Sequence, residues 1–274
     1  MNAGDSTSGH SWSRVERCIE RVSCRHRLPN MYGRVAHVMR GIDAFVAKRR
    51  LVKLRDRDSM QTLTLEHAAA RIPDGAILMI GGFMGVGTPE RLVDELVRQG
   101  RRDLTVIAND TALPGVGIGK LISANAVRKV IASHIGLNPE TQRKMIAKEI
   151  DVELVPQGTL IERIRAAGYG LGGILTPTGV GTVVEEGKRK IDVDGREYLL
   201  ETPLHADFAL VQAFLADYLG NLTYALTARN FNPVIAMAAT TVIVVSEHVV
   251  PVGMISPDHV MTPGVLVDYL VAGA

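Results

Sequence analysis

One short stretch of the chain passes from a strand through a glycine-rich loop into a helix: Ile77-Leu78-Met79-Ile80-Gly81-Gly82-Phe83-Met84-Gly85-Val86-Gly87-Thr88-Pro89-Glu90. The four apolar residues have the length of a buried strand, and Pro73-Asp74-Gly75 ahead of them predicts a turn. We expect Thr88 to cap the helix that follows, with Pro89 at its first position and Glu90 near the positive end of its dipole. The stretch therefore predicts one strand–loop–helix unit.

The same alternation continues along the chain. Buried strands are predicted at residues 104–108, 127–132 and 152–155. One helix is predicted to begin at Asn138, and a second to span residues 160–167 and to end at Gly168. Apolar strands separated by helices are typical of an α/β fold with a mainly parallel open sheet and helices on both faces. After Thr182, Asp194-Gly195 predicts a β-hairpin, and strands follow at 208–211 and 242–245. We predict a single domain over residues 60–274.

Charge separates the first 59 residues from the rest of the 274-residue chain. They hold 13 Lys and Arg against six Asp and Glu, a net charge of +7, whereas residues 60–274 carry −5. We expect this basic leader to be disordered, and three explanations stay open: an organelle transit peptide, a basic interaction tail, or an over-extended start. The third explanation places the true start of the protein at Met60. A helix pattern follows Met60 at once, with apolar residues at Leu63, Leu65, Ala68, Ala69 and Ile72.

Composition excludes several classes of function. The body beyond the leader is acidic, and its aromatic residues are only five Tyr and four Phe, with no Trp. It therefore lacks the basic, aromatic surface of a nucleic-acid-binding protein. The longest nearly uncharged apolar run, residues 234–245, is too short to span a bilayer. Cys18 and Cys24 both lie in the leader, and the His residues of the body have no metal-ligand spacing. We expect a cytoplasmic protein that binds no nucleic acid, no membrane and no metal.

Three glycine-rich strings are candidate ligand loops. The string at 168–173 matches G-x-G-x-x-G, but a predicted helix precedes it, the reverse of the dinucleotide-binding order. The string at 115–120 departs from a phosphate loop at Pro114 and Leu121. Residues 81–87 lie between a strand and a helix, where open α/β sheets bind ligands, although a tight turn without a ligand explains such a loop as well.

Nucleophiles are scarce in the body of the chain. It has no Cys, and none of its four Ser residues lies in a G-x-S-x-G elbow. The body of the chain thus has loops that suit a ligand but few side chains that could act as catalytic groups. This combination is typical of one half of a shared active site.

The chain resembles the class I coenzyme A transferases from about Met60 to Leu270. Residues 74–89 fit the first signature of that family in full, and five further segments look like it: 107–111, 155–160, 176–179, 217–221 and 228–233. Among its members, the α subunits of acetate/butyrate–acetoacetate enzymes are most similar, followed by the succinyl-CoA:3-oxoacid and 3-oxoadipate relatives. The resemblance implies an α/β fold shared with some sugar-phosphate isomerases.

The resemblance also implies a mechanism and partners. In this family CoA is a substrate rather than a cofactor, and it moves between an acyl-CoA and a short-chain carboxylic or 3-oxo acid in a ping-pong reaction. A glutamate attacks the acyl-CoA, and that glutamate lies in a partner β subunit. The chain has no counterpart of the glutamate motif, so it is expected to be the α subunit of a heteromer.

Site residues carry over by resemblance onto matching positions only. Gln157 matches an oxyanion-stabilising side chain, although a turn residue before Gly158 is the structural alternative, and Asn109 matches a polar position of the pocket. The expected substrate-binding set is Gly81, Gly82, Phe83, Met84, Gly85, Asn109, Gly158, Gly170, Thr178 and Gly179. Two other functions stay open: a stand-alone sugar-phosphate isomerase and a non-catalytic regulatory subunit.

Overall fold

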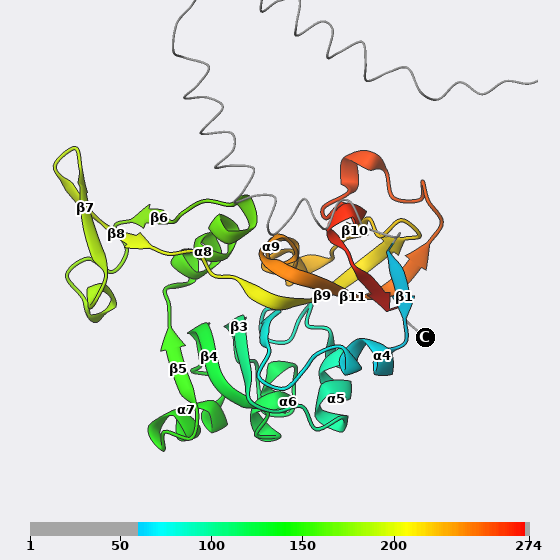
Figure 1. Ribbon diagram of the computed structural model, residues 1–274, viewed down its shortest axis with the longest axis horizontal. Helices are drawn as coiled ribbons and strands as arrows, with labels where there is room; N and C mark the ends of the chain where they lie inside the picture. The colour runs from blue at the N-terminus through cyan, green and yellow to red at the C-terminus, as the bar shows by residue number, and fades with distance from the viewer. Residues whose placement is uncertain (1–59, 272–274) are drawn as a thin grey trace, which may run out of the picture. The chain divides into compact units, whose positions relative to one another are not determined.

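A nine-stranded, mainly parallel sheet runs through residues 60–271, the part of the chain that the computed structural model describes (Figure 1). Its main path is β1-β12-β11-β9-β2-β3-β4-β5, and the short strand β10 pairs antiparallel with β9. The leader expected at 1–59 lies outside the described residues. The bounds of the sheet strands are β1 (Gln61–Leu63), β2 (Ile77–Ile80), β3 (Leu104–Asp110), β4 (Val127–His134), β5 (Asp151–Leu154), β9 (Ala206–Asp217), β10 (Leu222–Thr223), β11 (Ala239–Val250) and β12 (Tyr269–Val271).

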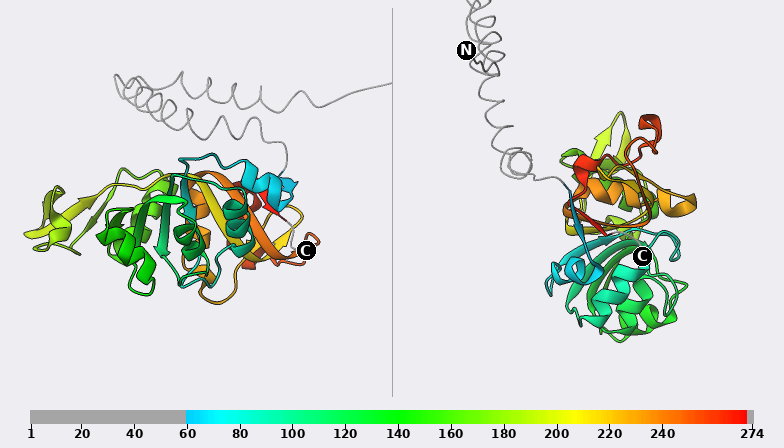
Figure 2. Two further views of the ribbon diagram at one scale, coloured as in Figure 1. Left: turned by 90° about the horizontal axis from the view of Figure 1, so that it is seen from below. Right: turned by 90° about the vertical axis from the view of Figure 1, so that its right-hand side faces the viewer.

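Helices cover both faces of this sheet, as predicted (Figure 1 and Figure 2). Alternate residues of β2 point to opposite faces: Leu78 and Ile80 join one buried cluster and Met79 joins the other. The first cluster contains apolar residues of α4, α5 and α6, and the second those of α8 and α9. The α-helices of the described residues are α4 (Leu65–Ala70), α5 (Glu90–Arg98), α6 (Ile118–Ser123), α7 (Pro139–Ile146), α8 (Gln157–Tyr169) and α9 (Asn232–Ala238).

Two predictions at helix boundaries are wrong. The segment after Met60 begins with strand β1, which includes Leu63, and the helix starts only at Leu65. Helix α8 spans Gln157–Tyr169 rather than 160–167, and it ends at Gly170 in the left-handed conformation. Gly168 does not end it, because this glycine is a packing residue: a Cβ built on it would lie 2.7 Å from Cβ of Met237 in α9.

A separate three-stranded antiparallel sheet, of order β6-β8-β7, follows α8. It comprises β6 (Ile174–Thr176), β7 (Arg189–Val193) and β8 (Arg196–Glu201). The predicted hairpin is confirmed, since β7 and β8 pair across Asp194-Gly195, both with positive φ. Within residues 60–271, four short 3₁₀ helices lie in connections: η2 (Val183–Glu185), η3 (Leu226–Arg229), η4 (Pro257–His259) and η5 (Gly264–Leu266).

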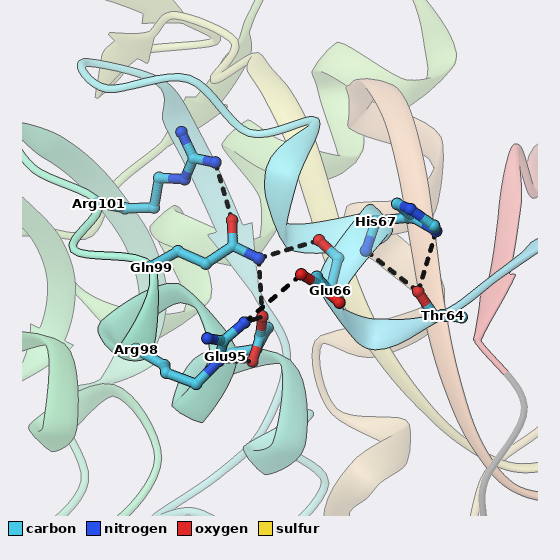
Figure 3. Close-up of polar contacts among 7 residues, drawn as sticks. All are labelled: Thr64, Glu66, His67, Glu95, Arg98, Gln99 and Arg101. Atoms are coloured by element: carbon cyan, nitrogen blue, oxygen red, sulfur yellow. Dashed lines mark hydrogen bonds and ion pairs between the residues drawn. The ribbon is translucent and has the colours of Figure 1, made fainter.

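A surface cluster of polar side chains fastens α5 to α4 (Figure 3). Gln99 donates from Nε2 to the backbone oxygen of Glu66 at 2.9 Å and to Oε1 of Glu95 at 2.7 Å. Hydrogen bonds from Arg98 and Gln99 lower the pKa of the Glu95 carboxyl to about 2. The cluster holds the far end of α5, the helix that begins where the glycine loop ends.

Candidate functional site

The carboxyl ends of β2, β3 and β5 supply the candidate site. These strands are parallel and connected through β4, so their carboxyl ends meet at one edge of the sheet. The glycine loop 81–87 follows β2, Asn109 and Asp110 end β3, and Gln157 starts α8 two residues after β5. Ligands bind at this edge in open α/β sheets.

The glycine loop is shaped by side chains that occupy the space of missing Cβ atoms. A Cβ on Gly81 would lie 1.9 Å from Oδ1 of Asn232, and one on Gly82 would lie 2.1 Å from Oγ1 of Thr88. Asn232 is fully buried and donates from Nδ2 to the backbone oxygens of Gly87 and Ala228, both at 2.9 Å. The loop therefore depends on glycine for close packing, not only for turning.

The expected N-cap of α5 is wrong. The helix begins at Glu90 with Pro89 at the cap position, and no side chain caps it. The Thr88 hydroxyl instead donates to the backbone oxygen of Gly81 at 3.0 Å, which closes the loop across its base. The same side chain occupies the space that a Cβ on Gly82 would need.

Three amide side chains meet beside this loop. Gln157 donates from Nε2 to Oδ1 of Asn109 at 3.4 Å, and Asn230 donates from Nδ2 to the same oxygen at 3.3 Å. Asn109 is 3% exposed, so its orientation is set by these partners and by its own Nδ2, which donates to Asp110 at 2.8 Å. Gln157 is the first residue of a helix rather than a turn residue, so it stands on a rigid element.

A pocket of about 310 Å³ opens at the same place, lined by Phe83, Gln157, Thr227 and Asn230. All four lining residues are uncharged. The amide groups of Gln157 and Asn230 are neutral hydrogen-bond donors beside the aromatic ring of Phe83. The arrangement suits a ligand that has a small apolar group and develops negative charge on an oxygen.

The segment that supplies Thr227 and Asn230 is anchored by Tyr224. Its hydroxyl lies 2.6 Å from Oγ1 of Thr262, and its backbone oxygen accepts from Nε of Arg229 at 3.1 Å. Burial raises the pKa of the Tyr224 phenol well above its usual range, so the group is neutral and structural. Thr227 and Asn230 were not expected in the site. Asn230 lies within the family-like segment 228–233, which was the available signal, whereas no pattern pointed to Thr227.

The structure brings together only part of the expected substrate-binding set. Gly81, Gly82, Phe83, Met84 and Gly85 lie in the loop, Asn109 lies beside it, and Gly158 adjoins Gln157. Gly170 ends the 13-residue helix α8, about 20 Å from its start at a rise of 1.5 Å per residue. Thr178 and Gly179 follow β6 in the connection to η2, and neither is among the lining residues of the pocket.

Within 60–271 no three His, Cys, Asp or Glu side chains are grouped so as to hold a metal ion. None of the helices in that range combines the length and the apolar character needed to cross a bilayer.

Known sequences and structures are similar to this chain over most of its length. The coenzyme A transferase family model matches residues 62–273. The acetate CoA-transferase subunit alpha of Escherichia coli K12 is 59% identical over 209 residues, which are 76% of this chain and 95% of that protein. The acetoacetyl-CoA:acetate/butyrate CoA transferase alpha subunit of Clostridium acetobutylicum is 53% identical over 209 residues, 76% of this chain and 96% of that one.

Solved structures share the fold. The apoenzyme of an acyl-CoA transferase from Escherichia coli O157:H7 superposes with a TM-score of 0.69 at 25% identity, covering 78% of this chain and 47% of that longer chain. A variant of the decarboxylase AibA/AibB superposes with a TM-score of 0.67 at 28% identity, and the match covers 79% of this chain and 84% of the decarboxylase chain. The match of the family model, together with the close relatives, shows that this chain belongs to the coenzyme A transferase family.

Proposed function

We propose that this chain is the α subunit of a heteromeric CoA-transferase that moves CoA between an acyl-CoA and a short-chain carboxylic or 3-oxo acid. The observation that carries the proposal is the cluster of neutral amides, Gln157, Asn109 and Asn230, beside an uncharged pocket. The names of the relatives support the heteromer, since they are alpha subunits acting on acetate, acetoacetyl-CoA or butyrate. CoA is a substrate in this proposal, and the expected cytoplasmic location is part of it.

The nucleophile in this proposal belongs to a partner β subunit. A carboxylate oxygen of its glutamate attacks the thioester carbonyl, the C–S bond breaks, and CoA leaves as the thiolate while a mixed anhydride remains. The thiolate then attacks the glutamyl carbonyl and releases the first acid as a carboxylate. The second acid reverses these two steps on the glutamyl-CoA thioester. The lining of the pocket agrees with this division, because it contributes no carboxylate from this chain.

Gln157 stabilises the oxyanions of these steps in the proposal. Each addition to a carbonyl places negative charge on oxygen, and a preorganised neutral donor lowers the energy of that state. An amide does so without forming an ion pair with the partner's carboxylate. Gln157 also starts α8, whose positive dipole end favours negative charge.

The lining residues do not favour a sugar-phosphate isomerase. Phosphate recognition needs Lys or Arg, or a loop of backbone N–H groups, together with an acid or base for proton transfer. Phe83, Gln157, Thr227 and Asn230 supply no acid or base for proton transfer.

The test is turnover of the chain with and without its β partner. We expect no CoA transfer by the isolated chain and transfer by the assembled heteromer. Borohydride reduces a glutamyl-CoA thioester to an alcohol and releases CoA, and we expect mass spectrometry to locate this reduced glutamate on the partner. An adduct on a glutamate of this chain, or failure of a size-verified heteromer to transfer CoA, contradicts the proposal. A non-catalytic regulatory subunit would leave activity in the partner alone.

Gln157→Ala tests the role of the amide. Removing one oxyanion donor costs on the order of 10²–10³-fold in kcat, and we expect this loss in kcat and kcat/KM alike. Gln157→Glu should be at least as damaging, because a second carboxylate would face the developing charge. Gln99→Ala is the matched control, since Gln99 lies in the surface cluster of α5. Normal turnover in a Gln157→Ala heteromer would leave backbone N–H groups as the oxyanion donors.

A further inference from the structure

A buried carboxylate lies directly behind the neutral amides of the site. Asp110 ends β3 and is 7% exposed. Its Oδ2 accepts from the backbone N–H of Met84 at 2.9 Å and from Nδ2 of Asn109 at 2.8 Å, while Oδ1 accepts from the N–H of Ala112 at 2.7 Å. The carboxylate thus contacts the glycine loop, the following turn and the amide cluster at once.

Two of these partners have a backbone conformation that L-residues rarely adopt. Met84 has φ 50° and Ala112 has φ 51°, both in the left-handed region. This conformation costs a non-glycine residue roughly 1–2 kcal/mol, so it persists only where the surroundings hold it. Hydrogen bonds to an ionised carboxylate are among the stronger ones available to a backbone N–H. One side chain therefore holds two strained positions on either side of the site.

The same carboxylate decides which way the Asn109 amide faces. An ionised carboxylate only accepts hydrogen bonds, so the NH₂ end of Asn109 must point to Asp110 and its oxygen must point away. That oxygen accepts one hydrogen from Nε2 of Gln157 and one from Nδ2 of Asn230. Gln157 is left with its second N–H hydrogen for a ligand. The orientation of the Gln157 amide is therefore linked to Asp110 through Asn109.

We propose that Asp110 is a positioning residue that orients the Gln157 amide through Asn109 and holds the glycine loop at Met84. The inference rests on the proposed function and adds a residue that does not itself line the pocket. It predicts that loss of the carboxylate slows the chemical step without changing the groups that contact the substrate.

The direct test is Asp110→Asn in the assembled heteromer. An amide at this position must turn its NH₂ end toward at least one of the three N–H groups that the carboxylate accepts. We expect kcat to fall by about 10- to 100-fold while KM for acyl-CoA changes by less than about threefold, because small misplacements of a catalytic group act mainly on the transition state.

Asp217→Asn is a matched control. Asp217 ends β9, is 2% exposed, and accepts from the N–H groups of Leu219 and Asn221 and from Nδ2 of Asn221, each at 2.9 Å. It has the same chemistry as Asp110 but contacts neither the loop 81–87 nor the amide cluster. We expect a comparable loss of thermal stability in both variants, and a loss of kcat only in Asp110→Asn.

A double-mutant cycle separates positioning from general damage. If Asp110 acts through Gln157, Asp110→Asn should slow a Gln157→Ala heteromer by less than about threefold, because the group it orients is already gone. Should Asp110→Asn fail to assemble, Asn109→Ala replaces it in the cycle, since it breaks the link to Gln157 and keeps both backbone bonds of Asp110.

The outcomes distinguish this inference from the proposed function. Absence of CoA transfer in the wild-type heteromer would contradict the function. With an active wild type, normal kcat in an assembled Asp110→Asn or Asn109→Ala heteromer overturns the positioning role. Equal slowing of the wild-type and Gln157→Ala backgrounds overturns it as well, whereas the less-than-additive result supports it.

Discussion

Glycines at two places in this molecule look alike in the sequence and differ in what surrounds them. In the loop 81–87, side chains fill the space where a Cβ would be, as Asn232 does at Gly81. At the two ends of α8, apart from neighbouring residues of the chain and the backbone of the helix itself, no described atom lies within 4 Å of a Cβ built on Gly158 or Gly170. All the loop glycines are needed for packing, and all but Gly81 also have a positive φ. Gly170 is needed for its positive φ of 71° alone, and Gly158 has no steric reason among the described residues.

The comparison shows that the base of the glycine loop is packed against core side chains, while Phe83, Met84 and Val86 at its tip are exposed. Asn232 reaches it from α9 and is fixed by three hydrogen bonds, the third being accepted by Oδ1 from the N–H of Gln212 at 3.0 Å. The loop that holds Phe83 at the pocket therefore shares its stability with the sheet.

The largest effect is expected for Gly81→Ala. The new methyl group would overlap Oδ1 of Asn232 at 1.9 Å, and Asn232 has no room to move because it is fully buried. We expect a loss of about 3 kcal/mol in the free energy of unfolding, from overpacking together with broken buried hydrogen bonds. Urea unfolding measures it, with Gly172→Ala as a control, since beyond its two chain neighbours no described atom lies within 4 Å of a Cβ there.

A second substitution shows whether the clash with Asn232 is the cause. Asn232→Ala alone should cost about 2 kcal/mol, because it leaves buried backbone groups without partners. In that background Gly81→Ala should cost less than about 1 kcal/mol, since the methyl group then has space. Simple addition of the two losses would show that Gly81 is constrained by something other than this side chain.

Local chemistry explains which features could be predicted from the sequence. The unit from Ile77 to Glu90 depends on neighbouring residues, and its strand, loop and helix are confirmed. The site depends on distant ones: Asn109 meets Gln157 across 48 residues and Asn230 across 121. Asn109 and Gln157 were expected only because the chain resembles a known family.

The errors have the same physical origin. Thr88 was expected as an N-cap because it precedes Pro89, but Pro89 itself occupies the cap position, and the Thr88 hydroxyl donates to the oxygen of Gly81. Gly168 was expected to end α8, yet close approach of Met237 from α9 explains that glycine. In both cases a tertiary contact overrides a local preference, and local patterns carry no information about such contacts.

A smaller effect is expected for Gly170→Ala. The residue ends α8 with φ 71° and no steric neighbour, so only the backbone conformation opposes a side chain. We expect a loss of about 1 kcal/mol in the free energy of unfolding. Gly170→Asn should restore part of it, because Asn tolerates the left-handed region better than Ala. Equal losses for Ala and Asn in urea unfolding would indicate a contact, as at Gly81, rather than a conformational need.

The smallest effect, and the only one of opposite sign, is expected for Gly158→Ala. Gly158 is the second residue of α8, its φ is not positive, and the described residues leave the space beside it open. Ala is a better helix former than Gly, so the isolated chain should gain about 0.5 kcal/mol in urea unfolding.

Kinetics of the same variant then decide why a glycine stands next to Gln157. If substrate approaches the backbone there, as expected from the family resemblance, the added methyl group should raise KM for acyl-CoA in the heteromer although the chain is more stable. Such a gain of stability at the expense of function is the usual sign of a residue kept for binding. Unchanged KM in a stabilised Gly158→Ala heteromer would remove Gly158 from the substrate-binding set and leave Gln157 as the functional residue at the start of α8.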